Sequence, residues 1–61
     1  MVNKIVELRE SRNIKQEQLS RELNVSLNTI KNWENGKVKP QASNLRKLAL
    51  YFGVSTDIFL Y

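Results

Sequence analysis

The 61-residue chain contains no cysteine and no histidine, and these absences exclude several kinds of site. Without cysteine there is no disulfide framework and no thiolate metal site. Without histidine the usual imidazole ligand and general base is missing. The six carboxylates that remain would need a pocket to act as an acid–base pair, and a chain this short rarely builds one. We therefore expect no enzyme, no metal site and no cofactor.

Long apolar runs are absent as well. No segment approaches the roughly 20 apolar residues of a membrane span. Charges interrupt the apolar pattern of the opening MVNKIVELRE, which is therefore not a signal peptide. The sequence predicts a soluble, cytoplasmic protein that forms one domain over residues 1–61. A chain of about 60 residues buries only roughly 60% of its surface, so its core must be small and efficient.

One proline and two glycines are the only strong breakers, and the chain between them shows short helical patterns joined by tight turns. Apolar residues recur at spacings of three and four, and no segment shows a strand pattern. Candidate caps and stops separate the segments, among them the predicted N-cap Ser26 and the predicted stops Asn24 and Gly36. The predicted helices cover residues 2–12, 16–23, 27–35, 42–52 and 56–61. The predicted fold is all-α, a compact bundle of five helices.

The third predicted helix, from Leu27 to Asn35, has two different faces. Ile30 and Trp33 share one face, which assigns the tryptophan to the core rather than to a stacking platform. The turn of about three residues before this helix makes it cross the preceding helix steeply, as in a helix-turn-helix, so the other face points away from the bundle. That face carries Leu27, Asn28, Lys31, Asn32 and Asn35.

Net positive charge is concentrated in the second half of the chain, because most of the acids lie in the first half. The net charge is +4 and the sequence pI is about 9.8. From Lys31 to Lys47 there are five Lys or Arg and a single acid, Glu34. This distribution suits an anionic partner.

The string QEQLSRELNVSLNTIKNWENGKVKP resembles the helix-turn-helix of the lambda-repressor and Cro-type family. In that family a Gln opens the second helix, a Val-Ser pair follows the turn, and Trp-Glu-x-Gly ends the recognition helix before a basic loop. The resemblance extends into both flanks and covers almost the whole chain. The chain departs from the family pattern by having Asn13 and Asn24 in place of glycine, Ser20 in place of alanine, and Lys15 in place of a capping Ser or Thr.

The resemblance implies a transcriptional regulator that binds double-stranded DNA sequence-specifically, with repression the commoner role. The helix from Leu27 would enter the major groove, and the helix from Gln16 would cross the backbone. Asparagine can pair with adenine, and an apolar side chain can meet the thymine methyl. The expected base contacts are Leu27, Asn28, Lys31 and Asn32. The expected phosphate contacts are Gln16, Thr29, Asn35, Lys37 and Lys39.

The resemblance also implies an ion pair between Arg9 and Glu34 that ties the first helix to the third. It further suggests a homodimer on an operator with inverted half-sites, and the dimer can be weak enough to form only on DNA. Ile58 and Tyr61, three residues apart on the last predicted helix, are the expected interface. A frayed C-terminus, or an apolar edge that a longer parent chain covers, are the alternatives.

Other functions stay open at this stage. A protein-interaction or antitoxin-like helical module of the same fold is the main alternative, and the salt dependence of binding separates it from a DNA-binding protein. An RNA-binding domain is disfavoured because exposed aromatics that stack on splayed bases are missing. Thr29 and the two loop lysines could equally have structural or solubilising roles. The sequence does not specify the operator, or whether the chain is complete or part of a longer regulator.

Overall fold

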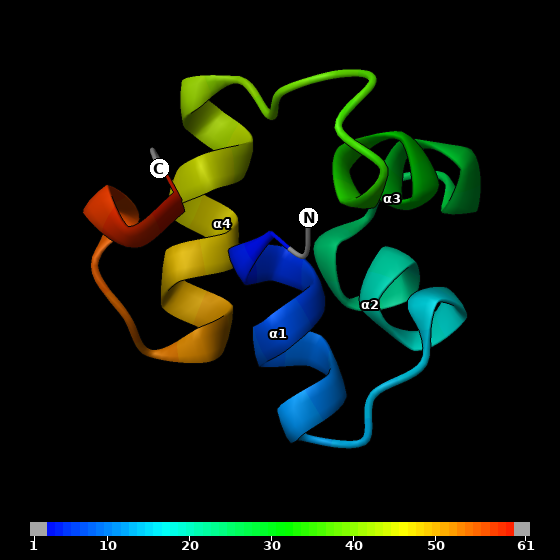
Figure 1. Cartoon of the computed structure of the whole chain (residues 1–61), viewed down its shortest axis with the longest axis horizontal. Coiled ribbons are helices and arrows are strands. Elements are labelled where there is room, and N and C mark those ends of the chain that lie inside the picture. Colours follow the sequence, from blue (N-terminus) through cyan, green and yellow to red (C-terminus); the bar gives the residue numbers. More distant parts are fainter. Residues whose placement is uncertain (1–2, 60–61) are drawn as a thin grey trace.

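The computed structural model describes residues 3–59, and this part of the chain forms four α-helices and one short 3-10 helix. The elements are α1 (Lys4–Ser11), α2 (Gln16–Leu23), α3 (Leu27–Glu34), α4 (Ala42–Phe52) and the 3-10 helix η1 (Thr56–Phe59). In Figure 1, α2 and α3 lie together on one side, α4 and η1 on the other, and α1 lies between them. Among the described helices, none has both the length and the apolar composition needed to cross a bilayer.

The predicted bundle of five helices is wrong, because the last predicted helix is a single 3-10 turn over the residues that the structure describes. Its backbone bond joins Ile58 N to the Ser55 carbonyl three residues earlier, at 3.3 Å. Ser55 Oγ accepts from Asp57 N at 3.2 Å and so caps the turn. A segment this short makes too few hydrogen bonds to offset the entropy of helix nucleation. The predicted extension to Tyr61 lies outside the described residues.

The ends of the helices follow local side-chain chemistry. α1 begins at Lys4 because Asn3 Oδ1 accepts from Val6 N at 3.0 Å, as an N-cap does. α3 ends at Glu34, one residue earlier than predicted.

Three departures from the family pattern have visible consequences at the turns. Asn13 and Asn24 adopt the left-handed conformation, with φ of 56° and 57°, in the way that the glycines of the family would. Asn24 thereby ends α2. Lys15, which precedes α2, makes no side-chain cap.

The core lies where the inner faces of the helices meet. Leu19 of α2, Ile30 of α3 and Leu48 of α4 are completely buried. Trp33 retains only 4% of its exposure, so its predicted core role is confirmed. Phe59 of η1 is partly buried and packs against this cluster. The core therefore fixes α3 through its inner face and leaves its outer face free.

Candidate nucleic-acid interface

The turn between α2 and α3 sets the direction of α3. Asn24 adopts the left-handed conformation, and Val25 N donates to the Ser20 carbonyl at 3.0 Å while the valine side chain packs on the core. Ser26 then caps α3, since its Oγ accepts from Thr29 N at 3.0 Å. The turn thus starts α3 immediately beside α2, with Leu27 as its first residue.

The outward face of α3 carries three polar side chains that make no hydrogen bond within the described part of the chain. Asn28 and Lys31 are exposed, whereas Leu27 and Asn32 are partly buried. The side chains of Asn28, Lys31 and Asn32 make no hydrogen bond to any residue between 3 and 59. Two amides and one ammonium group on adjacent turns can therefore bind an external partner without breaking an internal bond.

Two of the residues expected at phosphates also have structural roles. Thr29 Oγ1 lies 2.8 Å from Ser26 Oγ, which strengthens the cap of α3. Asn35 Oδ1 accepts from Lys37 N at 2.9 Å and so shapes the turn after the helix. The side-chain nitrogen of Asn35 makes no hydrogen bond to any residue between 3 and 59. The Asn-Gly pair at 35–36 is itself a sequence signal for a turn.

The loop after α3 stays beside the outward face of that helix. Val38 N donates to the Asn32 carbonyl at 3.3 Å, which folds the loop back onto α3. Lys37 and Lys39 on either side of Val38 are exposed. Figure 1 shows this loop running from the end of α3 across to the start of α4. The loop therefore presents two lysines close to the end of the outward face of α3.

Arg9 and Glu34 form the ion pair that ties α1 to α3. Arg9 Nε lies 2.6 Å from Glu34 Oε2, and Arg9 Nη2 lies 3.1 Å from Oε1. Only 13% of the Arg9 side chain and 7% of the Glu34 side chain are exposed. The hydrogen bond to Glu34 raises the pKa of Arg9, the Glu34 and Glu10 charges add to it, and burial opposes them. A bidentate pair of this kind fixes direction as well as distance.

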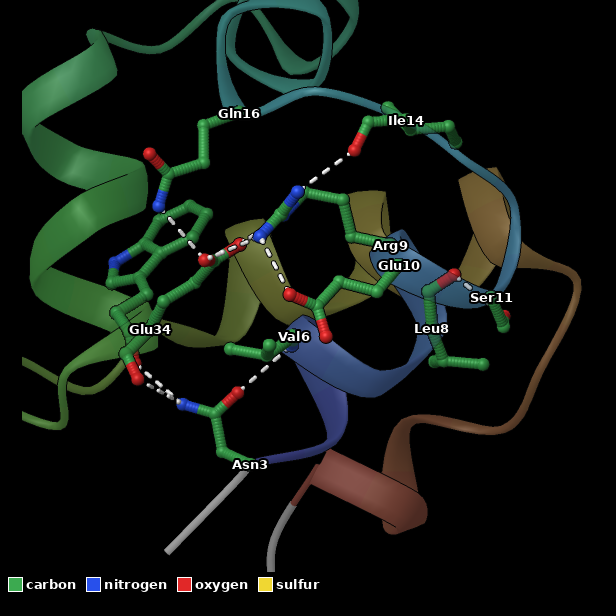
Figure 2. A network of polar contacts seen from close by, with 10 residues as sticks. Asn3, Val6, Leu8, Arg9, Glu10, Ser11, Ile14, Gln16 and Glu34 are labelled. Atoms are coloured by element: carbon green, nitrogen blue, oxygen red, sulfur yellow. Dashed lines mark hydrogen bonds and ion pairs between the residues drawn. The ribbon is translucent and has the colours of Figure 1, made fainter.

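Gln16 joins the same network, which the sequence did not reveal. Its Nε2 donates to Glu34 Oε1 at 2.9 Å, so the carboxylate lies between arginine and glutamine (Figure 2). One amide hydrogen of Gln16 is thus used inside the protein, and the second has no acceptor among residues 3–59. No spacing rule pairs residues 16 and 34, since their contact depends on how α2 and α3 pack.

Basic residues outnumber acids in the stretch of chain that forms this face and follows it. Between Leu27 and Gly53 the only acid is Glu34, and Arg9 already binds its carboxylate. The five basic residues of the same stretch therefore keep their charge uncompensated by acids nearby in sequence. One of them, Lys47, also donates to the Leu23 carbonyl at the end of α2, at 3.1 Å.

Of the two residues expected at the dimer interface, the structure describes only Ile58. Ile58 lies in η1 and is partly buried, while Tyr61 lies outside the described residues. The most exposed large apolar side chain of the described part is Leu50 of α4, at 85%. Leu50 stands alone on a polar face, and single apolar residues on a surface are normal.

Comparison with known proteins agrees with this geometry. The sequence matches the helix-turn-helix family over residues 5–59. The chain belongs to the Cro/C1-type helix-turn-helix family. It is 42% identical over 62 residues to the uncharacterized HTH-type transcriptional regulator MJ0272 of Methanocaldococcus jannaschii, a match that covers 100% of this chain and 94% of that protein. The family is one of DNA-binding transcriptional regulators, so the resemblance seen in the sequence is confirmed.

A second relative is much longer. The chain is 39% identical over 57 residues to the HTH-type transcriptional activator BcrR of Enterococcus faecalis. That match covers 93% of this chain but only 28% of BcrR. The chain therefore spans less than a third of BcrR and nearly all of the archaeal regulator.

Proposed function

We propose that this helix-turn-helix protein binds double-stranded DNA sequence-specifically and regulates transcription, with α3 in the major groove. The main support for this proposal is the outward face of α3. Asn28 and Lys31 are exposed there without side-chain partners in the described part of the chain, and the following loop adds two exposed lysines. An α-helix fits the major groove, where each base pair presents a distinct pattern of donors and acceptors.

Four side chains of α3 are proposed to contact bases. Asn28, near the beginning of the helix, can pair with N6 and N7 of adenine. Leu27 can place its remaining exposed surface against a thymine methyl. Lys31 and Asn32 lie one turn farther along and can reach a guanine or the next phosphate.

The phosphate contacts are proposed to come from the rim of this face. α2 begins without a side-chain cap, so its first backbone N–H groups stay open to an anion. The second amide hydrogen of Gln16 adds to that site. The proposed phosphate contacts are Gln16, Thr29, Asn35, Lys37 and Lys39.

We propose that two copies act together in the cytoplasm on an operator with inverted half-sites. The half-sites would lie about one helical turn apart, roughly 34 Å, since a two-fold dimer repeats its recognition helices at that spacing. Ile58 and Tyr61 are the proposed contact. One relative is named an activator, so the proposal covers regulation of either sign.

Selection of bound duplexes from a random DNA pool tests the proposal, followed by affinity measurements on the selected site over a range of salt concentrations. We expect inverted half-sites and a logarithm of affinity that falls linearly with the logarithm of salt concentration, as counterions are released. The double substitution of Lys37 and Lys39 by Gln should make that slope shallower by about 0.9 for each phosphate that the variant no longer neutralises. Binding that ignores salt and sequence would favour the protein-interaction module instead.

A further inference from the structure

The side-chain amide of Asn3 joins the beginning of α1 to the end of α3. Its Oδ1 accepts from Val6 N at 3.0 Å and so caps α1. Its Nδ2 donates to the backbone carbonyls of Trp33 at 2.8 Å and Glu34 at 3.1 Å. Figure 2 shows the amide between the two helix ends. Asn3 precedes the segment that matches the family, residues 5–59.

This amide completes the hydrogen bonding of α3. The last four carbonyls of an α-helix have no partner inside the helix. The turn that follows α3 supplies backbone N–H donors to the carbonyls of Lys31, Asn32 and Trp33. The fourth carbonyl, that of Glu34, has Asn3 Nδ2 as its only donor among residues 3–59. The basic loop begins at this same end of the helix.

We infer that Asn3 is a positioning residue for DNA recognition, an inference that rests on the proposed function of α3. Arg9 and Gln16 hold the side chain of Glu34, whose torsions allow the backbone to shift beneath it. Asn3 holds the backbone itself. It therefore sets where α3 ends relative to α1 and in which direction the loop with Lys37 departs. Hydrogen bonds to base edges weaken steeply when donor and acceptor are misaligned, so this orientation matters most at specific sites.

Two substitutions separate the cap of α1 from the tie to α3. Asn3→Ser keeps an oxygen that can cap α1, but its side chain is too short to donate to both carbonyls of α3. Asn3→Asp keeps the cap and adds a charge that the start of α1 favours. Its second oxygen would, however, face two carbonyl oxygens where the wild-type protein has a donor.

Arg12→Ala is the control for a loss of stability that does not reach α3. Arg12 Nη2 donates to the Phe52 carbonyl at 2.8 Å, and its guanidinium lies 5.0 Å from the centre of the Phe52 ring. These contacts join the end of α1 to α4. Their removal should lower the melting temperature without moving the end of α3.

The test compares affinities for the selected site and for unselected duplex, at a temperature where circular dichroism shows every variant folded. We expect Asn3→Ser and Asn3→Asp to bind the selected site about three- to ten-fold more weakly, the range for loss of one hydrogen bond, and unselected duplex as before. Arg12→Ala should keep the wild-type ratio. In hydrogen exchange without DNA, Asn3→Ser should speed exchange at Gly36 and Val38 and spare Val6.

Two results would overturn the inference, and they are distinguishable from failure of the proposed function. If the Asn3 variants keep the wild-type ratio of selected to unselected affinity, Asn3 only caps a helix. Unchanged exchange at Gly36 and Val38 in Asn3→Ser would show that the amide does not hold α3. If the wild-type protein itself prefers no sequence, the proposed function fails and the positioning role fails with it.

Discussion

Gln16, the first residue of α2, donates to Glu34, the last residue of α3, with Nε2 and Oε1 2.9 Å apart. Arg9 of α1 binds the same carboxylate through two donors. Three helices therefore meet at one buried side chain. A helix-turn-helix must contact the DNA backbone with one helix and bases with the next. This shared carboxylate links α1 and α2 to the end of α3 through side-chain contacts.

Gln16→Ala should weaken binding to all duplex sequences by a similar factor. The substitution removes a donor at the start of α2, where the proposed contact is a phosphate and carries no sequence information. Affinities for the selected site and for unselected duplex, measured at the same salt concentration, check this. Gln18→Ala is the matched control, because Gln18 is exposed in the same helix. A change in base preference would instead assign Gln16 to the orientation of α3.

Substituting either Arg9 or Glu34 by alanine should lower the melting temperature before it alters base preference. Removing one partner leaves the other partner's charge largely buried, which costs about 3 kcal/mol in a well-buried pair. A double-mutant cycle followed by denaturant unfolding should show coupling of at least about 0.5 kcal/mol. Additive losses would mean that the two side chains do not stabilise each other in solution.

Titration of Arg9 should not change the stability that the Arg9–Glu34 pair contributes near neutral pH. Glu34 raises the pKa of Arg9 above its ordinary value. A raised pKa of a cation contributes stability that is present below the unfolded-state pKa and is lost only as pH rises through the folded-state value. For a guanidinium that loss falls in strong alkali. Arg9→Lys keeps the charge but loses the bidentate geometry, so it should still be less stable than wild type at pH 7.

Asn28→Ala should cost about 1–3 kcal/mol at the selected site and relax preference at one adenine position. Asn28 is exposed and its amide has no partner in the described part of the chain, so the substitution removes base contacts without disturbing the fold. Selection from a random pool with the variant, beside the wild type, measures both effects. Lys37→Gln should instead weaken all sequences and leave the selected pattern intact. Unchanged affinity and unchanged preference in Asn28→Ala would disprove the recognition role.

Apart from the Arg9–Glu34 pair, which the family resemblance implied, the parts of the structure that the sequence predicted correctly depend on neighbours within one turn. Ser26 caps α3 through a residue three positions later, and Asn24 turns the chain through its own φ. The core residue Trp33 followed from helical spacing to Ile30. The last segment was predicted wrongly because four residues make too few hydrogen bonds to offset helix nucleation, so they close as a single 3-10 turn.

The polar contacts that the sequence did not reveal join residues far apart. Asn3 reaches the end of α3 across 30 residues, and Gln16 reaches Glu34 across 18. Only the packed helices bring these groups within hydrogen-bonding distance. Asn3 on its own resembles an ordinary N-cap, and Gln16 an ordinary first residue of a helix. The exposed face of α3 could be predicted from helical spacing, whereas the contacts that Asn3 and Gln16 make with the end of α3 could not.

Ile58→Lys should abolish cooperative filling of two half-sites. Ile58 is partly buried in η1, and a lysine there would place a charge in the proposed contact between two copies. Two identical charges would then meet across the two-fold axis, where each is desolvated and repelled by the other. Footprinting on the selected operator and sedimentation with and without DNA measure the effect. We expect single half-sites to be filled at an affinity close to that of the wild-type monomer.

Leu50→Lys is the matched control for that experiment. Leu50 lies in α4 and is 85% exposed, more than Ile58 in η1. Its substitution likewise replaces an apolar side chain by a lysine, but at a place where no contact between copies is proposed. It should leave cooperativity intact. If Leu50→Lys abolishes cooperativity and Ile58→Lys does not, the two copies meet through the outer face of α4. Since Leu50 projects freely from that helix, such a result would move the two-fold axis from η1 to α4 and change the expected spacing of the half-sites.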